Sequence, residues 1–279
     1  MRLAKKHIDI ETSWGSMKLV VLSPIGITEK VPGILWLHGG GYYEGSAEMA
    51  RISRGRDAAQ RYGAVIVSPE YRLSGEAPYP AALDDAYAAL VWLKKNADEL
   101  GVSVIMVGGE SAGGGLCAAL CMLARDRGEV DVVFQMPLYP MLDCDDTESS
   151  RDNVNPLFWD TRRNHEAWKQ YLGPLWGSDD VPPYASPAKQ TDYSRLPPCY
   201  TFVADGEPFY SETLRYVEEL KKAGVEAHAD VYHTDVHAFD QIFPFKRISR
   251  EAKENFLEYF GRANARFLAV DPPCGNVKK

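Results

Sequence analysis

Short apolar runs alternate along the chain with longer segments in which apolar and polar residues follow a helical period. Two early runs, at residues 7–13 and 17–23, are separated by a turn around Gly15, which predicts an antiparallel hairpin at one edge of a sheet. Six later runs are mostly continuous in their apolarity, as expected for strands that are buried on both faces. These six runs lie at residues 33–38, 64–69, 103–108, 131–137, 199–204 and 227–232.

Helical patterns separate the apolar runs, and each is long enough to form a right-handed crossover between parallel strands. They lie at residues 49–62, 80–99, 112–126, 210–223 and 246–268. This alternation predicts an α/β protein built on a mostly parallel, doubly wound sheet of about eight strands. A chain of 279 residues can bury one core of this kind, so we expect a single domain over residues 1–279.

Residues 143–196 interrupt this alternation directly after the sixth predicted strand. The segment is rich in Pro, Asp, Ser and aromatic residues, and it contains one clear helical pattern at residues 162–171. It is too long for an ordinary connection between neighbouring strands. Long insertions of this kind often form lids or binding loops, and we expect a lid inserted in the domain here.

The charge balance narrows the choice of partners. The chain carries 31 basic and 39 acidic side chains, a net charge of −8, which repels nucleic-acid backbones and anionic lipid surfaces. No run approaches the ~20 apolar residues that a membrane-spanning helix needs, and the first residues lack the apolar core of a secretory signal. We therefore expect a cytoplasmic protein without nucleic-acid or membrane partners; a homo-oligomer is compatible with the sequence, which leaves the oligomeric state open.

The cysteines point to reduced thiols, because they are odd in number and scattered. Cys117 and Cys121 stand four residues apart on a predicted helix, but no neighbouring His or Cys pair completes a set of metal ligands. We expect them to be core thiols. The five cysteines are Cys117, Cys121, Cys144, Cys199 and Cys274.

A G-x-S-x-G pattern joins a predicted strand to a predicted helix at residues 109–113, with Ser111 at its centre. A nucleophilic serine needs a very tight turn between strand and helix, and flanking glycines are required where a Cβ would collide with neighbouring backbone. A glycine-rich turn or a weak phosphate loop would share so short a pattern. The strand–turn–helix context favours a nucleophile elbow.

The sequence His38-Gly39-Gly40-Gly41 directly follows the strand at residues 33–38. Consecutive glycines allow backbone amides to point at an anion, and acyl transfer requires stabilisation of a tetrahedral oxyanion. The amides of Gly39 and Gly40, together with that of Ala112 behind the serine, are the expected donors. The two motifs would then supply the two halves of one oxyanion-binding site.

A serine hydroxyl is unreactive at neutral pH, so a histidine base and an orienting acid should follow it along the chain. His237 lies in the loop after the last predicted strand, where such a fold places its base; His233 is the second candidate. For the acid, the strand at residues 199–204 ends just before Asp205 and Glu207. Either carboxylate could serve, and the residues alone leave the choice open.

Together these residues resemble the hormone-sensitive-lipase-like family of α/β-hydrolase esterases, also called bacterial family IV carboxylesterases. The resemblance covers almost the whole chain from Gly33 onward. It rests on four ordered motifs, at residues 37–41, at 71–73 with 78–85, at 109–114 and at 237–239. It implies the α/β-hydrolase fold, with the lid insertion after the sixth strand, and a serine esterase that needs no metal or organic cofactor.

The resemblance also favours Glu207 as the triad acid. In the family this acid is usually the aspartate of a D-P-x-x-D-E stretch, and residues 207–212 of this chain, E-P-F-Y-S-E, occupy the matching place. A glutamate can hold the imidazole tautomer and stabilise the imidazolium as an aspartate does. We interpret Arg72 and Asp84, in the second motif, as an ion pair that braces the loop beneath the serine.

The N-terminal helical cap of many family members is missing here, because strands begin near His7. The lid must then come mainly from residues 143–196. Aromatic residues at such density usually pack on one another, so we expect a core role for them rather than ligand contact. The aromatic cluster in this insertion comprises Phe158, Trp159, His165, Trp168, Tyr171 and Trp176.

The sequence thus predicts a carboxylesterase that hydrolyses short-chain acyl esters of small molecules, with Ser111 as nucleophile, His237 as base and Glu207 as acid. The same machinery could cleave another acyl bond, in an acetylated sugar, a formamide or a small peptide, and the fold alone cannot choose between them. A non-catalytic ligand-binding protein is a further alternative, since the related plant gibberellin receptors keep the pocket and lose the base.

Overall fold

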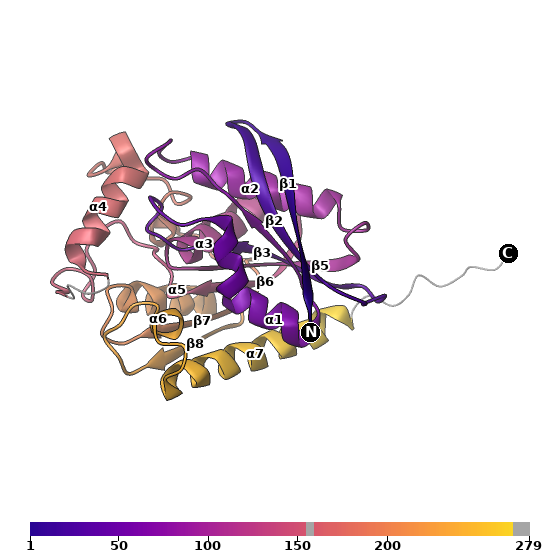
Figure 1. The fold of residues 1–279 in the computed structure, drawn as a ribbon. Helices are drawn as coiled ribbons and strands as arrows, with labels where there is room; N and C mark the ends of the chain where they lie inside the picture. Colours follow the sequence, from indigo (N-terminus) through magenta and orange to yellow (C-terminus); the bar gives the residue numbers. More distant parts are fainter. Residues whose placement is uncertain (155–158, 270–279) are drawn as a thin grey trace.

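The computed structural model describes residues 1–154 and 159–269, which form one mixed sheet with helices on both faces (Figure 1). The described residues contribute eight strands in the order β1-β2-β4-β3-β5-β6-β7-β8. The first two strands form the expected hairpin, β2 is antiparallel to β4, and all later pairs are parallel. The strands are β1 (Leu3–Thr12), β2 (Gly15–Pro24), β3 (Val31–Leu37), β4 (Val65–Pro69), β5 (Val102–Glu110), β6 (Val132–Leu138), β7 (Cys199–Ala204) and β8 (Ala227–Tyr232).

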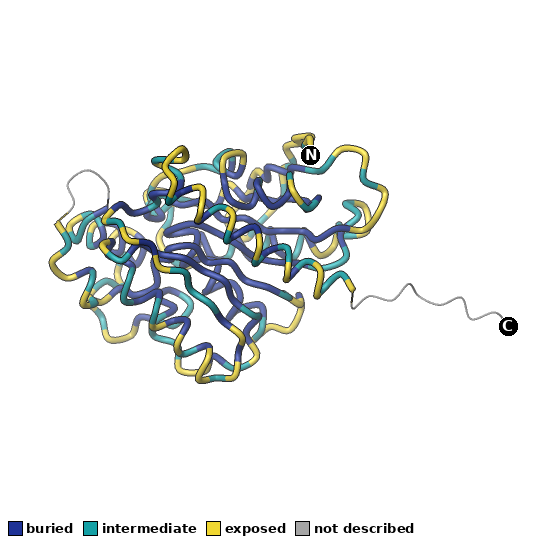
Figure 2. Tube along the Cα trace, turned by 90° about the horizontal axis from the view of Figure 1, so that it is seen from below, coloured by how far each residue is buried: buried dark blue, intermediate teal, exposed yellow. Residues whose placement is uncertain are grey.

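Two apolar cores lie on opposite faces of the sheet, because successive strand side chains alternate between the faces. Leu35 of β3 belongs to the core under three of the helices, whereas its neighbour Trp36 belongs to the core under the others. Figure 2 shows these buried strands in dark blue, beneath helices whose outer sides are exposed. The first core packs under α2 (Ala81–Lys95), α3 (Ala112–Arg127) and α5 (Tyr210–Lys222), and the second under α1 (Arg54–Tyr62), α6 (Phe239–Ile242) and α7 (Arg247–Leu268).

One expected helix is divided in two. Instead of a continuous helix over residues 49–62, the chain forms a 3₁₀ helix, η1 (Ala47–Ile52), and then α1. Ser53 stands between them in an extended conformation, and its hydroxyl accepts a hydrogen bond from the amide of Arg56. Serine is a preferred N-cap, so a new helix begins at Arg54. Arg54 thereby turns its side chain toward the interior, where it is buried.

The insertion at residues 143–196 carries α4 (Thr161–Leu172) and two short 3₁₀ helices, η2 (Gly173–Leu175) and η3 (Pro187–Lys189). Figure 1 shows α4 at one end of the sheet, away from the helices that cover its faces. The ring of Tyr171 stacks on Tyr42 with centroids 3.8 Å apart, and Trp168 packs beside them. This part of the aromatic cluster has the expected core role. Phe158 lies outside the described residues.

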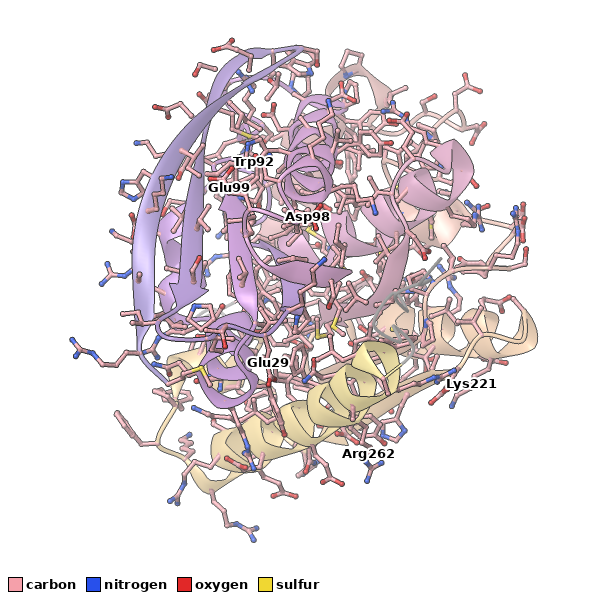
Figure 3. The ribbon with its side chains drawn as sticks, turned by 90° about the vertical axis from the view of Figure 1, so that its right-hand side faces the viewer. Glu29, Trp92, Asp98, Glu99, Lys221 and Arg262 are labelled. Atoms are coloured by element: carbon pink, nitrogen blue, oxygen red, sulfur yellow. The ribbon has the colours of Figure 1, made fainter. Side chains whose placement is uncertain are left out.

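The opposite end of the sheet, where β3 and β5 begin, is a solvated polar surface. Figure 3 faces this end and labels Glu29, Asp98 and Glu99 around it. Lys30 and Asp98 form an ion pair there at 3.0 Å, with side chains 62% and 95% exposed. Ion pairs this exposed contribute little to stability. Buried polar groups gather instead at the carboxyl ends of the strands.

The prediction that Arg72 forms an ion pair with Asp84 is wrong, because the carboxylate in contact with Arg72 is that of the neighbouring Asp85. The Arg72 guanidinium contacts both oxygens of Asp85, at 2.6 and 2.7 Å, and the Arg72 amide donates to Asp85 as well. Asp84 instead accepts a hydrogen bond from the indole of Trp14. Neighbouring residues on a helix point in directions about 100° apart, and the buried face of α2 includes Asp85 but not Asp84. The adjoining Tyr71 donates to the carbonyl of His38.

These contacts predict unequal effects of two neighbouring substitutions. Asp85→Asn leaves the partly buried Arg72 without its carboxylate and should lower the free energy of unfolding by about 3 kcal/mol. Asp84→Asn, the matched control, keeps an oxygen for Trp14 and should cost less than about 1 kcal/mol. Urea unfolding of both variants, with equal m-values, measures the difference. Equal losses would contradict the assignment of the ion pair to Asp85.

Candidate active site

Ser111 occupies a strained turn between β5 and α3. Its backbone has φ 57° and ψ −119°, a conformation that L residues seldom adopt and that costs roughly 1–3 kcal/mol. The Ser111 amide donates to the carbonyl of Leu138, and its own carbonyl accepts from the amide of Met141, so neighbouring chain segments fix the turn. A Cβ at Gly113 would lie 2.2 Å from the carbonyl oxygen of Leu37, which requires glycine at that position.

Three buried side chains form a continuous hydrogen-bonded series at this turn. The Ser111 hydroxyl lies 2.8 Å from Nε2 of His237, and Nδ1 of His237 contacts the Glu207 carboxylate. Ser111 and His237 are each 7% exposed, and Glu207 is 1% exposed. With Nδ1–H donating to the carboxylate, Nε2 is left as the acceptor for the serine proton. The structure therefore brings together three residues that lie far apart in the sequence.

The second candidates from the sequence form a separate pair. Asp205 contacts Nδ1 of His233 at 2.7 Å and accepts a hydrogen bond from the amide of Thr234. The hydrogen bond and charge of Asp205 raise the pKa of His233, whose side chain is 98% exposed. This pair stands at the surface of the loop after β8. In the structure it is His237, not His233, that contacts Ser111, and the carboxylate in contact with His237 is Glu207, not Asp205.

Backbone amides from two segments lie beside the serine. A Cβ on Gly39 would lie 3.3 Å from that of Ser111, so the glycine loop passes directly by this serine. Gly40 has φ 120° and a Cβ there would meet the carbonyl of Glu44 at 2.0 Å, which explains the glycine. Ala112 begins α3, and the first amides of a helix have no acceptor within it. The geometry is thus suited to an oxyanion.

His38 supports the glycine loop as a neutral ring. It is buried, stacks on Tyr71 with centroids 4.1 Å apart, and places Nδ1 2.8 Å from the carbonyl of Gly39. Burial lowers the pKa of His38 to about 4, because the charged imidazolium is poorly solvated there. The ring therefore remains uncharged at neutral pH and supports the glycine loop through its contact with the Gly39 carbonyl.

A cavity of about 620 Å³ opens onto Ser111 and His237. Apolar side chains from η1 and α6 form part of its wall, including Met49, Ile52 and Ile242. Trp159 also lines it, so this member of the aromatic cluster has a role beyond the expected packing. Nothing in the local sequence pattern marks these side chains as wall residues, because separate segments of the chain form the cavity.

Two buried carboxyl groups lie next to Ser111 and His237. Burial and the charge of Asp240 raise the pKa of Glu110 to about 7, although Arg54 opposes the shift. Burial also raises the pKa of Glu207, and this effect is opposed by its contact with His237. A carboxylate without water around it interacts strongly with an imidazolium, which suits Glu207 for stabilising a charge that develops on His237.

Cys117, Cys121, Cys144 and Cys199 are free and buried, as expected of core thiols, while Cys274 lies outside the described residues. Over residues 1–154 and 159–269, none of the helices combines the length and apolarity needed to cross a membrane.

The known proteins that this chain resembles are α/β hydrolases, and several of them are named as esterases. A family model described as alpha/beta hydrolase fold matches residues 34–241. Esterase LipI of Mycobacterium tuberculosis is 33% identical over 75% of this chain and 66% of its own length, and carboxylesterase NlhH of the same species is 34% identical over 77% and 69%. The solved structure of a bacterial heroin esterase superposes with a TM-score of 0.89 at 31% identity, covering 94% of this chain and 84% of that one. This chain thus spans about two thirds of the two curated relatives.

Proposed function

The chain belongs to the hormone-sensitive-lipase-like family of α/β hydrolases and is a carboxylic ester hydrolase, and from that premise we propose that it hydrolyses short-chain acyl esters of small molecules through an acyl-enzyme intermediate on Ser111. The observation that carries the proposal is the buried series from Ser111 through His237 to Glu207. This series places a hydroxyl, an imidazole and a carboxylate in the order that acyl transfer requires, and Ser111 and His237 line a cavity of ligand size.

In the acylation step, Nε2 of His237 accepts the proton of the Ser111 hydroxyl as its oxygen attacks the ester carbonyl. The carbonyl oxygen becomes an oxyanion, which the amides of Gly39, Gly40 and Ala112 would stabilise. Glu207 stabilises the imidazolium that forms on His237. The imidazolium then gives its proton to the departing alcohol, and the acyl group remains on Ser111.

In the deacylation step, His237 accepts a proton from a water molecule that attacks the acyl-enzyme. The second tetrahedral intermediate uses the same amides. Its collapse returns the proton to the oxygen of Ser111 and releases the carboxylic acid. Every proton transfer in the two steps uses groups of the chain, and the reaction requires no metal or organic cofactor.

Substitution of the nucleophile and base tests this mechanism. Ser111→Ala should abolish ester hydrolysis and labelling by a fluorophosphonate probe, with an unchanged thermal midpoint, because it removes a single oxygen from a small residue. His237→Ala should lower kcat by several orders of magnitude. His233→Ala is the matched control and should keep the wild-type rate, since His233 points into solvent. Near-wild-type turnover by Ser111→Ala would refute the mechanism.

The two carboxylates can be separated in the same assay. Glu207→Gln keeps the shape of the side chain but loses its charge, so kcat should fall by roughly a thousandfold or more at a similar thermal midpoint. Asp205→Asn should change kcat little, because the Asp205 carboxylate contacts the exposed His233 and the Thr234 amide rather than His237. A large loss of kcat in Asp205→Asn, with Glu207→Gln nearly unaffected, would transfer the role of acid to Asp205.

Short acyl chains should be the better substrates. The insertion at residues 143–196 supplies Trp159 and, from α4, Arg163, which line one side of a cavity of about 620 Å³. An acyl chain that outgrows this cavity gains no further apolar contact, so the specificity constant should stop rising with chain length. A series of p-nitrophenyl esters from acetate to laurate measures this. A kcat/KM that keeps rising beyond octanoate would be inconsistent with a compact acyl site.

A further inference from the structure

The loop that carries His237 is held in an unfavourable backbone conformation. Ala238, the next residue, has φ 55° and ψ 35°, in the left-handed region that costs a non-glycine residue roughly 1–2 kcal/mol. The helix that follows, α6, has only four residues and is too short to be stable by itself. Such a conformation persists only where surrounding contacts enforce it. The contacts of α6 therefore determine where the imidazole lies.

One of these contacts reaches the nucleophile turn directly. The side-chain amide of Gln241, in α6, donates a hydrogen bond of 2.9 Å to Oε1 of Glu110. Glu110 is the residue before Ser111, and Gln241 lies four residues after His237. The same oxygen of Glu110 accepts from the backbone amide of Arg54 at 3.3 Å. A single carboxylate thus connects the nucleophile turn, the start of α1 and the base loop.

A second contact holds α6 against the same point. The Arg54 guanidinium forms an ion pair of 2.9 Å with Asp240, and the two side chains are 6% and 0% exposed. Arg54 also contacts Asp57 at 2.5 Å, and Asp57 accepts a hydrogen bond from Lys253 of α7. Buried charges of this kind are strongly held, because breaking one pair leaves an uncompensated charge. Arg54 is therefore a fixed anchor for both Glu110 and α6.

We propose that Glu110 and Gln241 are positioning residues for the reaction: their hydrogen bond, anchored on Arg54, sets the distance between the Ser111 hydroxyl and Nε2 of His237. The proposal rests on the function proposed above. Neither residue exchanges a proton with the substrate; both act through the serine and histidine beside them. A displacement of about 1 Å between reacting groups can lower a rate a hundredfold, so a modest shift of the base loop is sufficient.

The proposal requires an acceptor at position 110 rather than a charge. Glu110→Gln keeps a carbonyl oxygen for both Gln241 and the Arg54 amide, so it should retain kcat within threefold of wild type. Glu110→Ala removes the acceptor and Gln241→Ala removes the donor. Both should lower kcat about tenfold with a much smaller change in KM, since each of these side chains forms only a small part of the cavity wall.

The experiment measures kcat and KM for one short-chain ester, the rate of fluorophosphonate labelling of Ser111, and the thermal midpoint of each variant. Gln60→Ala is the matched control, because Gln60 is a half-buried glutamine in α1, the helix of Arg54, and lies outside the cavity. The control should keep the wild-type kcat. In Gln241→Ala the labelling rate should fall in parallel with kcat, because both report how well His237 activates Ser111.

Three results would overturn the inference. The first is a wild-type kcat in Gln241→Ala, and the second is a kcat in Glu110→Gln as low as in Glu110→Ala. The third is a rise of KM with kcat unchanged, which would make Gln241 a substrate-binding residue instead. Each of these three results is judged against a wild-type protein that hydrolyses the ester and reacts with the probe. A wild-type protein that does neither would refute the proposed function and, with it, this inference.

Discussion

The strained turn at Ser111 is the constraint on which the rest of the site depends. The serine can keep φ 57° only because β5 ends beside β3 and β6, whose backbones bracket the turn. The start of α3 must then approach β3 so closely that a Cβ at Gly113 would collide with the carbonyl of Leu37. A fully paired central sheet stabilises this conformation, since the surrounding structure must offset local strain of roughly 1–3 kcal/mol.

Burial distinguishes the two carboxylate–histidine pairs at the end of the sheet. Both have similar contact geometry, and they come from the same two loops, after β7 and after β8. His233 is almost fully exposed, whereas His237 lies under Trp159, Phe209 and Tyr139. An ion pair in water is weak, while a buried carboxylate acts on its imidazole with little screening. Only the buried pair is suited to stabilise a charge that forms during a reaction.

The strength of interactions between buried charges also explains why charged groups are concentrated next to the site. Glu110, Asp240 and Arg54 are all buried, which is costly unless each charge is paired and hydrogen-bonded. Because they are paired, the guanidinium of Arg54 and the carboxylate of Glu110 connect three chain segments at defined distances. Apolar packing alone would hold the segments together without fixing their orientation, because dispersion contacts have no directional preference.

The sequence by itself determined the elements and the residue types of the site. Continuous apolar runs identified the buried strands, since period and burial are local properties, and glycines marked the turns at residues 39–41 and 109–113 where a Cβ does not fit. Only the tertiary structure decided which acid contacts His237, that Arg72 pairs with Asp85, and that Trp159, Ile52 and Gln241 face one cavity. Those contacts join residues that are far apart in the chain or depend on the rotation of a helix. No local sequence pattern determines how distant segments are oriented once they pack.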